Sequence, residues 1–503
     1  MLAVGLPLIF TVFSYQLNPD ATSYFSIAEK YARGELRSAV NGYWGPMLSL
    51  LLVPFVWAGA NLIIAAKSLA LLTVIGIVIT CYAYLRRLGV SQKLTLLGST
   101  VLAPTLLLWA ITEPITPDLL FSLLLLWLVI ALDMFSQKPS SRLGTVIGVL
   151  GAGLYFTKGI GFYIFLALVG AVVLRQCWNT KPPLKNLWRQ YKTMLIVFAC
   201  LIAPFVAAIS YKYQKITINT GASYNYAVVG PNLQWHHPLM SDSYAPANSS
   251  AYSAWEDPTL IAPALPHWNM FEDDNVGYFI SNIFTKNLLG LADELYEVGP
   301  LIAVGMLLAI LFAFGRAPWQ RQAYLFTALG VILIGGYSLL ALEARYIRAF
   351  EICGVLAFIL LTALLYKKRL IGRTQILVGG SIVFLVASTH FLQSVHNLAN
   401  VDQKVQAASL ALSQHIPRGS HIIADEFGPS LNACYHVKLQ CYGFMKTPES
   451  HDATLRSLKE NNIRYFVSYK PESKTDQKLQ VFLSDHFEQI TSNSFETLYK
   501  LKD

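Results

Sequence analysis

The sequence predicts a polytopic α-helical membrane protein with about eleven transmembrane helices, juxtamembrane helices on its outer face and a small C-terminal α/β soluble domain. Composition is the first reason. Of 503 residues, 54% are hydrophobic and only 13% are charged, with a mean hydropathy of +0.46. Soluble globular proteins carry about 25% charged residues. This composition excludes a soluble enzyme, a disordered scaffold and a disulfide-stapled secreted module.

Eleven apolar runs are long enough, or nearly so, to cross a bilayer, which takes about 17–25 residues. They lie approximately at residues 1–16, 63–85, 94–112, 118–135, 143–157, 161–175, 193–211, 298–315, 323–342, 347–366 and 375–392. The first run lacks a basic leader and a small-residue cleavage site, so we expect an uncleaved anchor rather than a signal peptide.

Charge alternates between successive connecting segments. The segments after every second run contain sixteen basic residues and no Asp or Glu. These are Arg86, Arg87, Lys93, Lys138, Arg142, Arg175, Lys181, Lys185, Arg189, Lys192, Arg316, Arg321, Lys367, Lys368, Arg369 and Arg373. By the positive-inside rule they face the cytoplasm, with the N-terminus inside and the C-terminus outside. The net charge of +9 is therefore mainly a topology signal, and we expect no nucleic-acid partner.

Two outer segments within the membrane part are too long to be simple connections. Residues 17–62 hold a polar stretch followed by the apolar run Pro46–Gly59, which is too short to span and is predicted to be a helix at the outer interface. Residues 212–297 are rich in Tyr, Trp, Pro and Asn and show little periodicity. A long loop of this kind is more often functional than idle.

The C-terminal segment, residues 400–503, mixes helical and strand-like patterns and predicts the α/β domain. The predicted strands are His421–Ala424 and Ile463–Tyr469, and the predicted helices lie around Val401–His415 and Asp452–Asn461. Cys434 and Cys441 also lie here. An oxidising outer compartment permits a disulfide between them, and two small buried thiols are the alternative.

Ionisable residues gather at the outer ends of the predicted helices. They are Asp20, Glu113, Asp118, Lys158, Arg345 and Tyr346, with Glu343 just before Arg345. Snorkelling at the interface accounts for single Lys or Arg residues. For the set as a whole we favour convergence on one site, since charges at membrane level are costly and usually functional.

These residue types suit one chemistry. A carboxylate can act as general base on a hydroxyl, and Lys and Arg can neutralise a phosphate leaving group. A site at membrane level also admits a substrate whose lipid tail stays in the bilayer. The set therefore indicates transfer of a group from a lipid phosphate on the outer face.

Four motifs follow one another along the chain. They are Asp20 with Tyr24 and Ala28, Asn41-Gly42-Tyr43-Trp44-Gly45-Pro46, Gly153-Leu154-Tyr155-Phe156-Thr157-Lys158-Gly159, and Glu343-Ala344-Arg345-Tyr346. In order and spacing the sequence resembles the glycosyltransferase C superfamily, close to bacterial aminoarabinose transferases and the protein O-mannosyltransferases of family 39. The resemblance covers most of the chain. It implies a polyprenyl-phosphate sugar donor, inversion at the anomeric centre, and a hydroxyl acceptor on a glycolipid, polysaccharide or protein.

The resemblance also implies roles for individual residues. Asp20 would be the catalytic carboxylate, with either Asp118 or Glu113 as the second acid. Lys158 and Arg345 would hold the donor phosphate, assisted by Tyr346. Weaker substrate contacts would come from Tyr24, Tyr43, Trp44, His236 and His237.

One departure from the pattern concerns the interfacial helix. Many relatives have Lys or His before its proline, where this chain has Trp44-Gly45-Pro46. One phosphate or metal contact would then be missing, or supplied by Arg33 or Arg37.

The resemblance further implies a domain division and a location. Residues 1–399 would form the catalytic transmembrane domain, and residues 400–503 an extracytoplasmic domain. The protein would lie in the cytoplasmic (inner) membrane of a bacterium with its site facing the periplasm.

Three alternatives remain open from the sequence. Adjacent His236 and His237 with nearby acids could bind a divalent metal ion, although we favour a lid packed by its own aromatic residues. A lipid-linked sugar flippase or transporter would place charges near mid-membrane along a path. A non-catalytic envelope assembly protein would have no need of the Asp20, Lys158 and Arg345 set.

Overall fold

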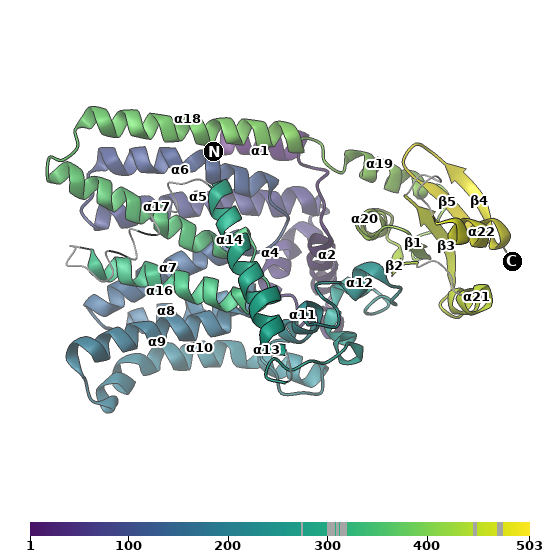
Figure 1. Ribbon diagram of the computed structural model, residues 1–503, viewed down its shortest axis with the longest axis horizontal. Coiled ribbons are helices and arrows are strands. Elements are labelled where there is room, and N and C mark those ends of the chain that lie inside the picture. Colours follow the sequence, from purple (N-terminus) through teal and green to yellow (C-terminus); the bar gives the residue numbers. More distant parts are fainter. Residues whose placement is uncertain are drawn as a thin grey trace.

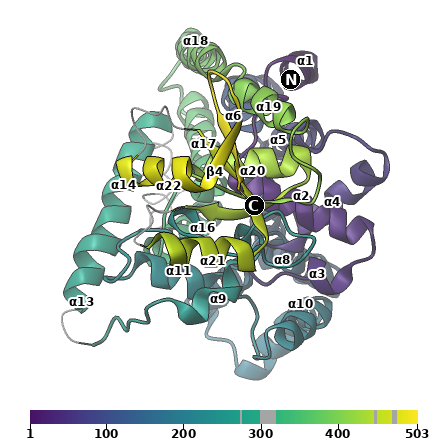
Figure 2. The ribbon, with the colours of Figure 1, turned by 90° about the vertical axis from the view of Figure 1, so that its right-hand side faces the viewer.

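A computed structural model describes residues 1–272, 275–298, 319–445, 450–469 and 476–502, together with Leu307 and Leu311. Long helices run side by side in a bundle, and a smaller unit of strands and short helices lies at one end of it (Figure 1). Viewed from that end, the smaller unit lies in front of the ends of the bundle helices (Figure 2).

Seven helical segments of the described chain are long and apolar enough to cross a membrane. They are α5 (Leu62–Arg87), α6 (Gln92–Thr112), α7 (Asp118–Gln137), α9 (Gly161–Thr180), α10 (Leu184–Lys212), α17 (Ala344–Lys367) and the segment that starts with α18 (Arg373–Leu398). Side chains such as Ile79, Leu174 and Leu385 are more than half exposed on the bundle surface, as lipid-facing residues are. The chain is thus a polytopic membrane protein, as its composition predicts.

The predicted number of eleven spans stays a prediction. Three of the remaining runs form helices that are shorter or more polar than a typical span: α1 (Leu2–Thr11), α8 (Ser141–Thr157) and α16 (Gln320–Ser338), which begins with Gln-Arg-Gln. The fourth run, 298–315, lies almost entirely outside the described residues. Both α8 and α16 pack within the bundle, against α10 and α17 respectively.

The first outer segment folds into α2 (Pro19–Ala32), α3 (Leu36–Ala39) and α4 (Pro46–Trp57). The predicted helix at Pro46 is confirmed, and its 12 residues are too few to span a bilayer. Both α2 and α4 start with proline at the first helical position, where its missing N–H costs nothing. The two helices share one buried apolar cluster.

The second outer segment is a chain of short helical pieces joined by irregular backbone. They are α11 (Gly221–Val229), α12 (Pro238–Ser241), η1 (Ala254–Glu256), η2 (Pro258–Leu260), η3 (Ala262–Ala264), α13 (Asn275–Tyr278), the π-helical η4 (Phe279–Phe284) and α14 (Thr285–Val298). Tyr224 and Trp255 from this segment are buried in the same cluster as α2 and α4. The described part of the predicted loop therefore packs on α2 and α4.

The C-terminal unit contains one five-stranded sheet in the order β2-β1-β3-β5-β4. Its elements are α19 (Gln403–Leu412), β1 (His421–Ala424), α20 (Phe427–Val437), β2 (Gln440–Phe444), α21 (His451–Glu460), β3 (Ile463–Ser468), α22 (Gln477–His486), β4 (Phe487–Ser492) and β5 (Thr497–Leu501). The strands β2, β1 and β3 are parallel, whereas β5 is antiparallel to β3 and β4. The two predicted strands are confirmed as β1 and β3, and the two predicted helices as α19 and α21.

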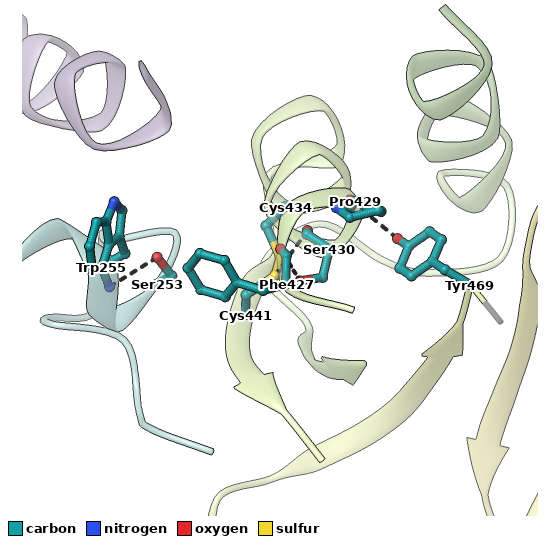
Figure 3. Close-up of a disulfide and its surroundings, with 8 residues drawn as sticks. All are labelled: Ser253, Trp255, Phe427, Pro429, Ser430, Cys434, Cys441 and Tyr469. Atoms are coloured by element: carbon teal, nitrogen blue, oxygen red, sulfur yellow. Dashed lines mark hydrogen bonds between the residues drawn. A yellow bond between two sulfur atoms is a disulfide. The ribbon is translucent and has the colours of Figure 1, made fainter. Parts of the chain in front are cut away.

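Cys434 of α20 and Cys441 of β2 form a disulfide, so of the two alternatives the structure shows the bonded one (Figure 3). The same view shows Phe427 of α20 directed toward Trp255 of η1, with ring centroids 6.2 Å apart. Lys438, which follows α20, donates a hydrogen bond to Glu29 of α2 at 2.8 Å. The C-terminal unit therefore packs directly on the outer segments.

Candidate functional site

Four segments far apart in the sequence meet at one end of the bundle. Asp20 lies in the first turn of α2, Asp118 is the first residue of α7, Lys158 follows the last residue of α8, and Arg345 lies in the first turn of α17. Helix N-termini favour acids and helix C-termini favour bases, so three of the four placements suit the local backbone. The fourth, Arg345, places a positive charge at the positive end of the helix dipole of α17, and the nearby carboxylates offset that repulsion.

Arg345 is the centre of the charge cluster. Its guanidinium lies 3.6 Å from Asp20, 4.0 Å from Asp118 and 2.7 Å from Glu343. Lys158 Nζ lies 2.5 Å from the other oxygen of Asp118. Three carboxylates therefore share two cations. Because the carboxylates repel a further anionic group, such a group could bind only in direct contact with Lys158 or Arg345.

Asp20 is held from two sides. The indole Nε1 of Trp255 donates to Oδ1 at 3.2 Å, and Arg345 faces Oδ2. Burial raises the pKa of Asp20, and the charge of Arg345 and the indole hydrogen bond lower it only in part. One-fifth of the side chain is exposed, so this carboxylate is both a stronger base than usual and open to a substrate.

Aromatic rings form a wall beside Lys158. Its Nζ lies 4.0 Å from the ring centroid of Tyr346, a cation–π distance. The Tyr346 ring stacks on Tyr337 with centroids 4.4 Å apart, and its hydroxyl donates to Glu343 at 2.9 Å. The Lys158 side chain is thereby directed toward Asp118 and remains one-fifth exposed.

Glu113 lies outside this cluster of contacts. Arg348 donates to one oxygen of Glu113 from Nε and Nη2 at 3.0 and 2.7 Å, and it donates to Glu351 from Nη1 at 2.8 Å. Burial raises the pKa of Glu113, with Arg348 opposing it. Of the two acids that the sequence left open, the structure thus brings Asp118 to Asp20, Lys158 and Arg345, and pairs Glu113 with Arg348.

The predicted substrate aromatics lie beside Asp20. The ring of Trp44 contacts those of Tyr24, Tyr43 and Trp255, with centroids 5.1, 4.7 and 5.9 Å apart. Tyr24 and Trp44 are buried, whereas Tyr43 donates from its hydroxyl to Asn225 at 3.0 Å. These rings pack on one another, so Tyr24 and Trp44 do not form an exposed stacking platform.

Gly45 explains the departure before the interfacial helix. A Cβ added there would lie 2.4 Å from the backbone oxygen of Thr157 and 2.6 Å from that of Phe156. Real Cβ atoms essentially never lie so close to backbone, so Lys or His at this position would force the backbone of Phe156 and Thr157 to shift. Arg33, one suggested substitute, is engaged by Glu35 at 2.6 Å.

The two histidines of the outer segment differ in environment. His236 is exposed, whereas the His237 ring packs 6.1 Å from those of Tyr224 and Trp255. Burial lowers the pKa of His237, and within the described residues its Nδ1 has no hydrogen-bond partner. In the described part of the chain these histidines do not gather with a third metal ligand; the one such group there is His451, Asp485 and His486.

Sequence reasoning missed the importance of Trp255. Its backbone oxygen accepts hydrogen bonds from Trp44 Nε1 at 3.2 Å and Ser23 Oγ at 3.3 Å. The next residue, Glu256, forms a buried ion pair with Lys30 of α2. A lysine in the last turn of a largely buried helix was the available signal, because a buried charge requires a partner.

The comparisons with known proteins concern structure. No protein-family model and no curated protein matches the sequence. Among solved structures, the chain is similar to ArnT from Cupriavidus metallidurans bound to undecaprenyl phosphate, with a TM-score of 0.59, 12% identity, and coverage of 99% of this chain and 97% of that one. The chain is equally similar to ArnT from the same organism in the apo state, with a TM-score of 0.59, 13% identity, and coverage of 99% of this chain and 96% of that one.

An oligosaccharyltransferase from Archaeoglobus fulgidus in the apo form is also similar, with a TM-score of 0.52, 11% identity, and coverage of 93% of this chain and 69% of that one. The chain is thus a polytopic membrane protein that shares its fold with ArnT and with this oligosaccharyltransferase. The predicted resemblance to the glycosyltransferase C superfamily is confirmed at the level of the fold, over nearly the whole chain.

Proposed function

We propose that this protein is an integral membrane glycosyltransferase. It moves a sugar from a polyprenyl-phosphate donor to a hydroxyl of a glycolipid, polysaccharide or protein, on the outer face of a bacterial cytoplasmic membrane. The observation that carries the proposal is the convergence of Asp20, Lys158 and Arg345 from three distant segments at the outer ends of the helices. The likeness of fold to ArnT, which binds undecaprenyl phosphate, supports it.

Asp20 is the general base in this proposal. It removes the proton from the acceptor hydroxyl as the hydroxyl oxygen forms a bond to the anomeric carbon. The bond from that carbon to the phosphate oxygen breaks on the opposite face, so the configuration inverts and polyprenyl phosphate leaves. The raised pKa of Asp20 supports the role, because a base is most effective when its pKa is near the working pH.

Lys158 and Arg345 bind the donor phosphate, with Tyr346 orienting Lys158. When Asp20 takes up the proton it becomes neutral, and Arg345 loses one of its carboxylate partners. Its charge then becomes available to the phosphate at the moment when negative charge builds up there. Arg345 thus stabilises the negative charge that develops on the phosphate in the transition state. Asp118 is the second acid, since it holds Lys158 and faces Arg345.

The domain division follows from this role. Residues 1–399 form the catalytic part and residues 400–503 an extracytoplasmic part. Phe427 of the C-terminal unit contacts Trp255, and Trp255 contacts Asp20. These contacts favour a role for the C-terminal unit in holding Trp255 in place beside Asp20.

The buried ionisable groups within the spans have partners, which argues against a transport path. Lys67 donates to Gln16 and to the backbone oxygen of Ile111 at 2.7 and 2.6 Å. Asp133 accepts from Arg321 at 2.6 Å. Such paired groups are typical of structural contacts between helices.

The test uses purified protein in liposomes with a panel of polyprenyl-phosphate sugars and mass spectrometry of candidate acceptors. We expect transfer by the wild type and by the exposed-acid control Glu488→Gln, and none by Asp20→Asn at equal membrane insertion. Translocation of the lipid without transfer would replace the proposal by a flippase. Undiminished transfer by Asp20→Asn would remove the assigned base but retain the enzyme class.

A further inference from the structure

A second group of potential ligands lies in the C-terminal unit, at the far end from the bundle (Figure 1). His451 is the first residue of α21, and Asp485 and His486 are the last two residues of α22. One ligand atom from each of the three lies within 4.8 Å of the other two. The bundle site does not include any of these residues.

The distance between the two imidazoles suits a tetrahedral ion. His486 Nε2 lies 3.3 Å from His451 Nδ1. Two nitrogens that each lie about 2.0–2.1 Å from a tetrahedral zinc ion are about 3.3 Å apart. The two nitrogens are therefore as far apart as two ligands of one tetrahedral ion are.

Packing holds the two rings in place. Phe482, fully buried in α22, lies 5.0 Å from the ring centroids of both His451 and His486. Lys502 Nζ donates to the backbone oxygens of Ser484 and Asp485 at 2.9 and 3.0 Å, and so fixes the last turn of α22. Ligands oriented by such surroundings lose little entropy when an ion binds.

A hydrogen bond between the imidazoles would explain their distance but not the carboxylate beside them. Among the described residues, the Asp485 side chain has no hydrogen-bond or ion-pair partner. An exposed carboxylate near two imidazole nitrogens completes the mixed nitrogen and oxygen set that zinc prefers.

We propose that His451, Asp485 and His486 bind a divalent transition-metal ion, with zinc as the best fit and a fourth position open to water. The ion joins the start of α21 to the end of α22, two helices of the same sheet unit. Binding to the folded state alone stabilises that unit, and the stabilisation grows with the logarithm of the ion concentration once it exceeds the dissociation constant. The inference is independent of the proposed transferase activity.

The test uses the full-length protein in detergent with a histidine-free affinity tag, stripped by a chelator and titrated with ZnCl2 by calorimetry. Differential scanning measures the unfolding midpoint with and without zinc. His451→Ala and Asp485→Asn each remove one ligand, and His415→Ala removes an exposed histidine of the same unit as the matched control.

We expect one zinc ion per chain at this site and a higher unfolding midpoint with zinc in the wild type and His415→Ala. Affinity should fall tenfold or more in His451→Ala and in Asp485→Asn, and the zinc-dependent rise in midpoint should vanish. Because Asp485 is exposed, its variant is expected to fold normally. Equal zinc affinity in the wild type and both ligand variants, or no binding by the wild type, overturns the proposal.

Discussion

The indole Nε1 of Trp255 donates a hydrogen bond to Oδ1 of Asp20 at 3.2 Å. Trp255 lies 235 positions from Asp20 in the sequence and belongs to the outer segment that the sequence predicts to be a loop. Because Arg345 lies 3.6 Å from the other oxygen, the indole and the guanidinium together hold the orientation of the carboxylate. Trp255 thus contacts the charge cluster through Asp20.

Replacing Trp255 with Phe should shift the dependence of activity on pH. As the proposed general base, Asp20 would act in its deprotonated form, so we expect the rate to rise as pH rises through its pKa. Arg345 of α17, Asp118 of α7, Glu343 and Trp255 all face this carboxylate, and the indole hydrogen bond lowers its pKa. Its loss raises the pKa further, and the rising limb moves to higher pH. We also expect a rate about tenfold lower, since a hydrogen bond to a charged group contributes about 1.5 kcal/mol.

The measurement is a pH–rate profile, with Trp268→Phe as the control. Trp268 is another tryptophan of the outer segment, and its Nε1 donates to the backbone oxygen of Tyr226 at 2.7 Å. A profile for Trp255→Phe that coincides with that of the control would show that the indole hydrogen bond has no role.

Lys158→Ala and Arg345→Ala should weaken donor binding more than acceptor binding. Each removes a cation from the cluster around Asp118, and a charge-assisted contact to phosphate contributes about 1.5–3 kcal/mol. We expect the donor dissociation constant to rise about ten- to a hundredfold. Arg33→Ala is the control, because Arg33 is engaged by Glu35. Donor affinity unchanged in both variants, or reduced equally in the control, would remove the assigned phosphate contacts.

Gly45→Ala should lower both thermal stability and activity. The new methyl group would lie 2.4 Å from the Thr157 oxygen, so the chain just before Lys158 must move. Overpacking of this kind costs about 1–3 kcal/mol. The control is Gly170→Ala in α9, where an added Cβ would have no neighbour within 4 Å. Its thermal stability should be unchanged or slightly higher, since alanine favours helix more than glycine does. Thermal midpoints and transfer rates measure both effects, and equal values for the two variants would contradict the steric argument.

Lys30→Met should destabilise the outer segments. It leaves Glu256 buried without its cation, which typically costs about 3–5 kcal/mol. The double variant Lys30→Met with Glu256→Gln should recover part of the loss, because no uncompensated charge remains. Limited proteolysis of the outer segment and thermal midpoints measure this. A double variant no more stable than the single one would show that the ion pair is not the cause.

Much of the architecture could be predicted from the sequence because a bilayer acts on each segment separately. Apolar runs of sufficient length form helices in lipid wherever they occur, and basic loops such as the one at Arg86 and Arg87 predict an orientation without reference to neighbours. The strand at His421–Ala424 and the helix at Pro46 are equally local patterns. Local patterns also predicted the helix ends, and therefore that the charged residues Asp20, Asp118, Lys158 and Arg345 lie there.

Tertiary structure alone decided which of these residues meet. Asp118 and Glu113 are five positions apart and alike in chemistry, yet one faces Lys158 and the other Arg348, because that depends on how α7, α8 and α17 pack. The contact of Trp255 with Asp20 and the close approach of Gly45 to Thr157 join segments with no shared local pattern. Local hydropathy and charge determine where a chain crosses the membrane, whereas contacts between distant segments depend on the packing of the whole bundle.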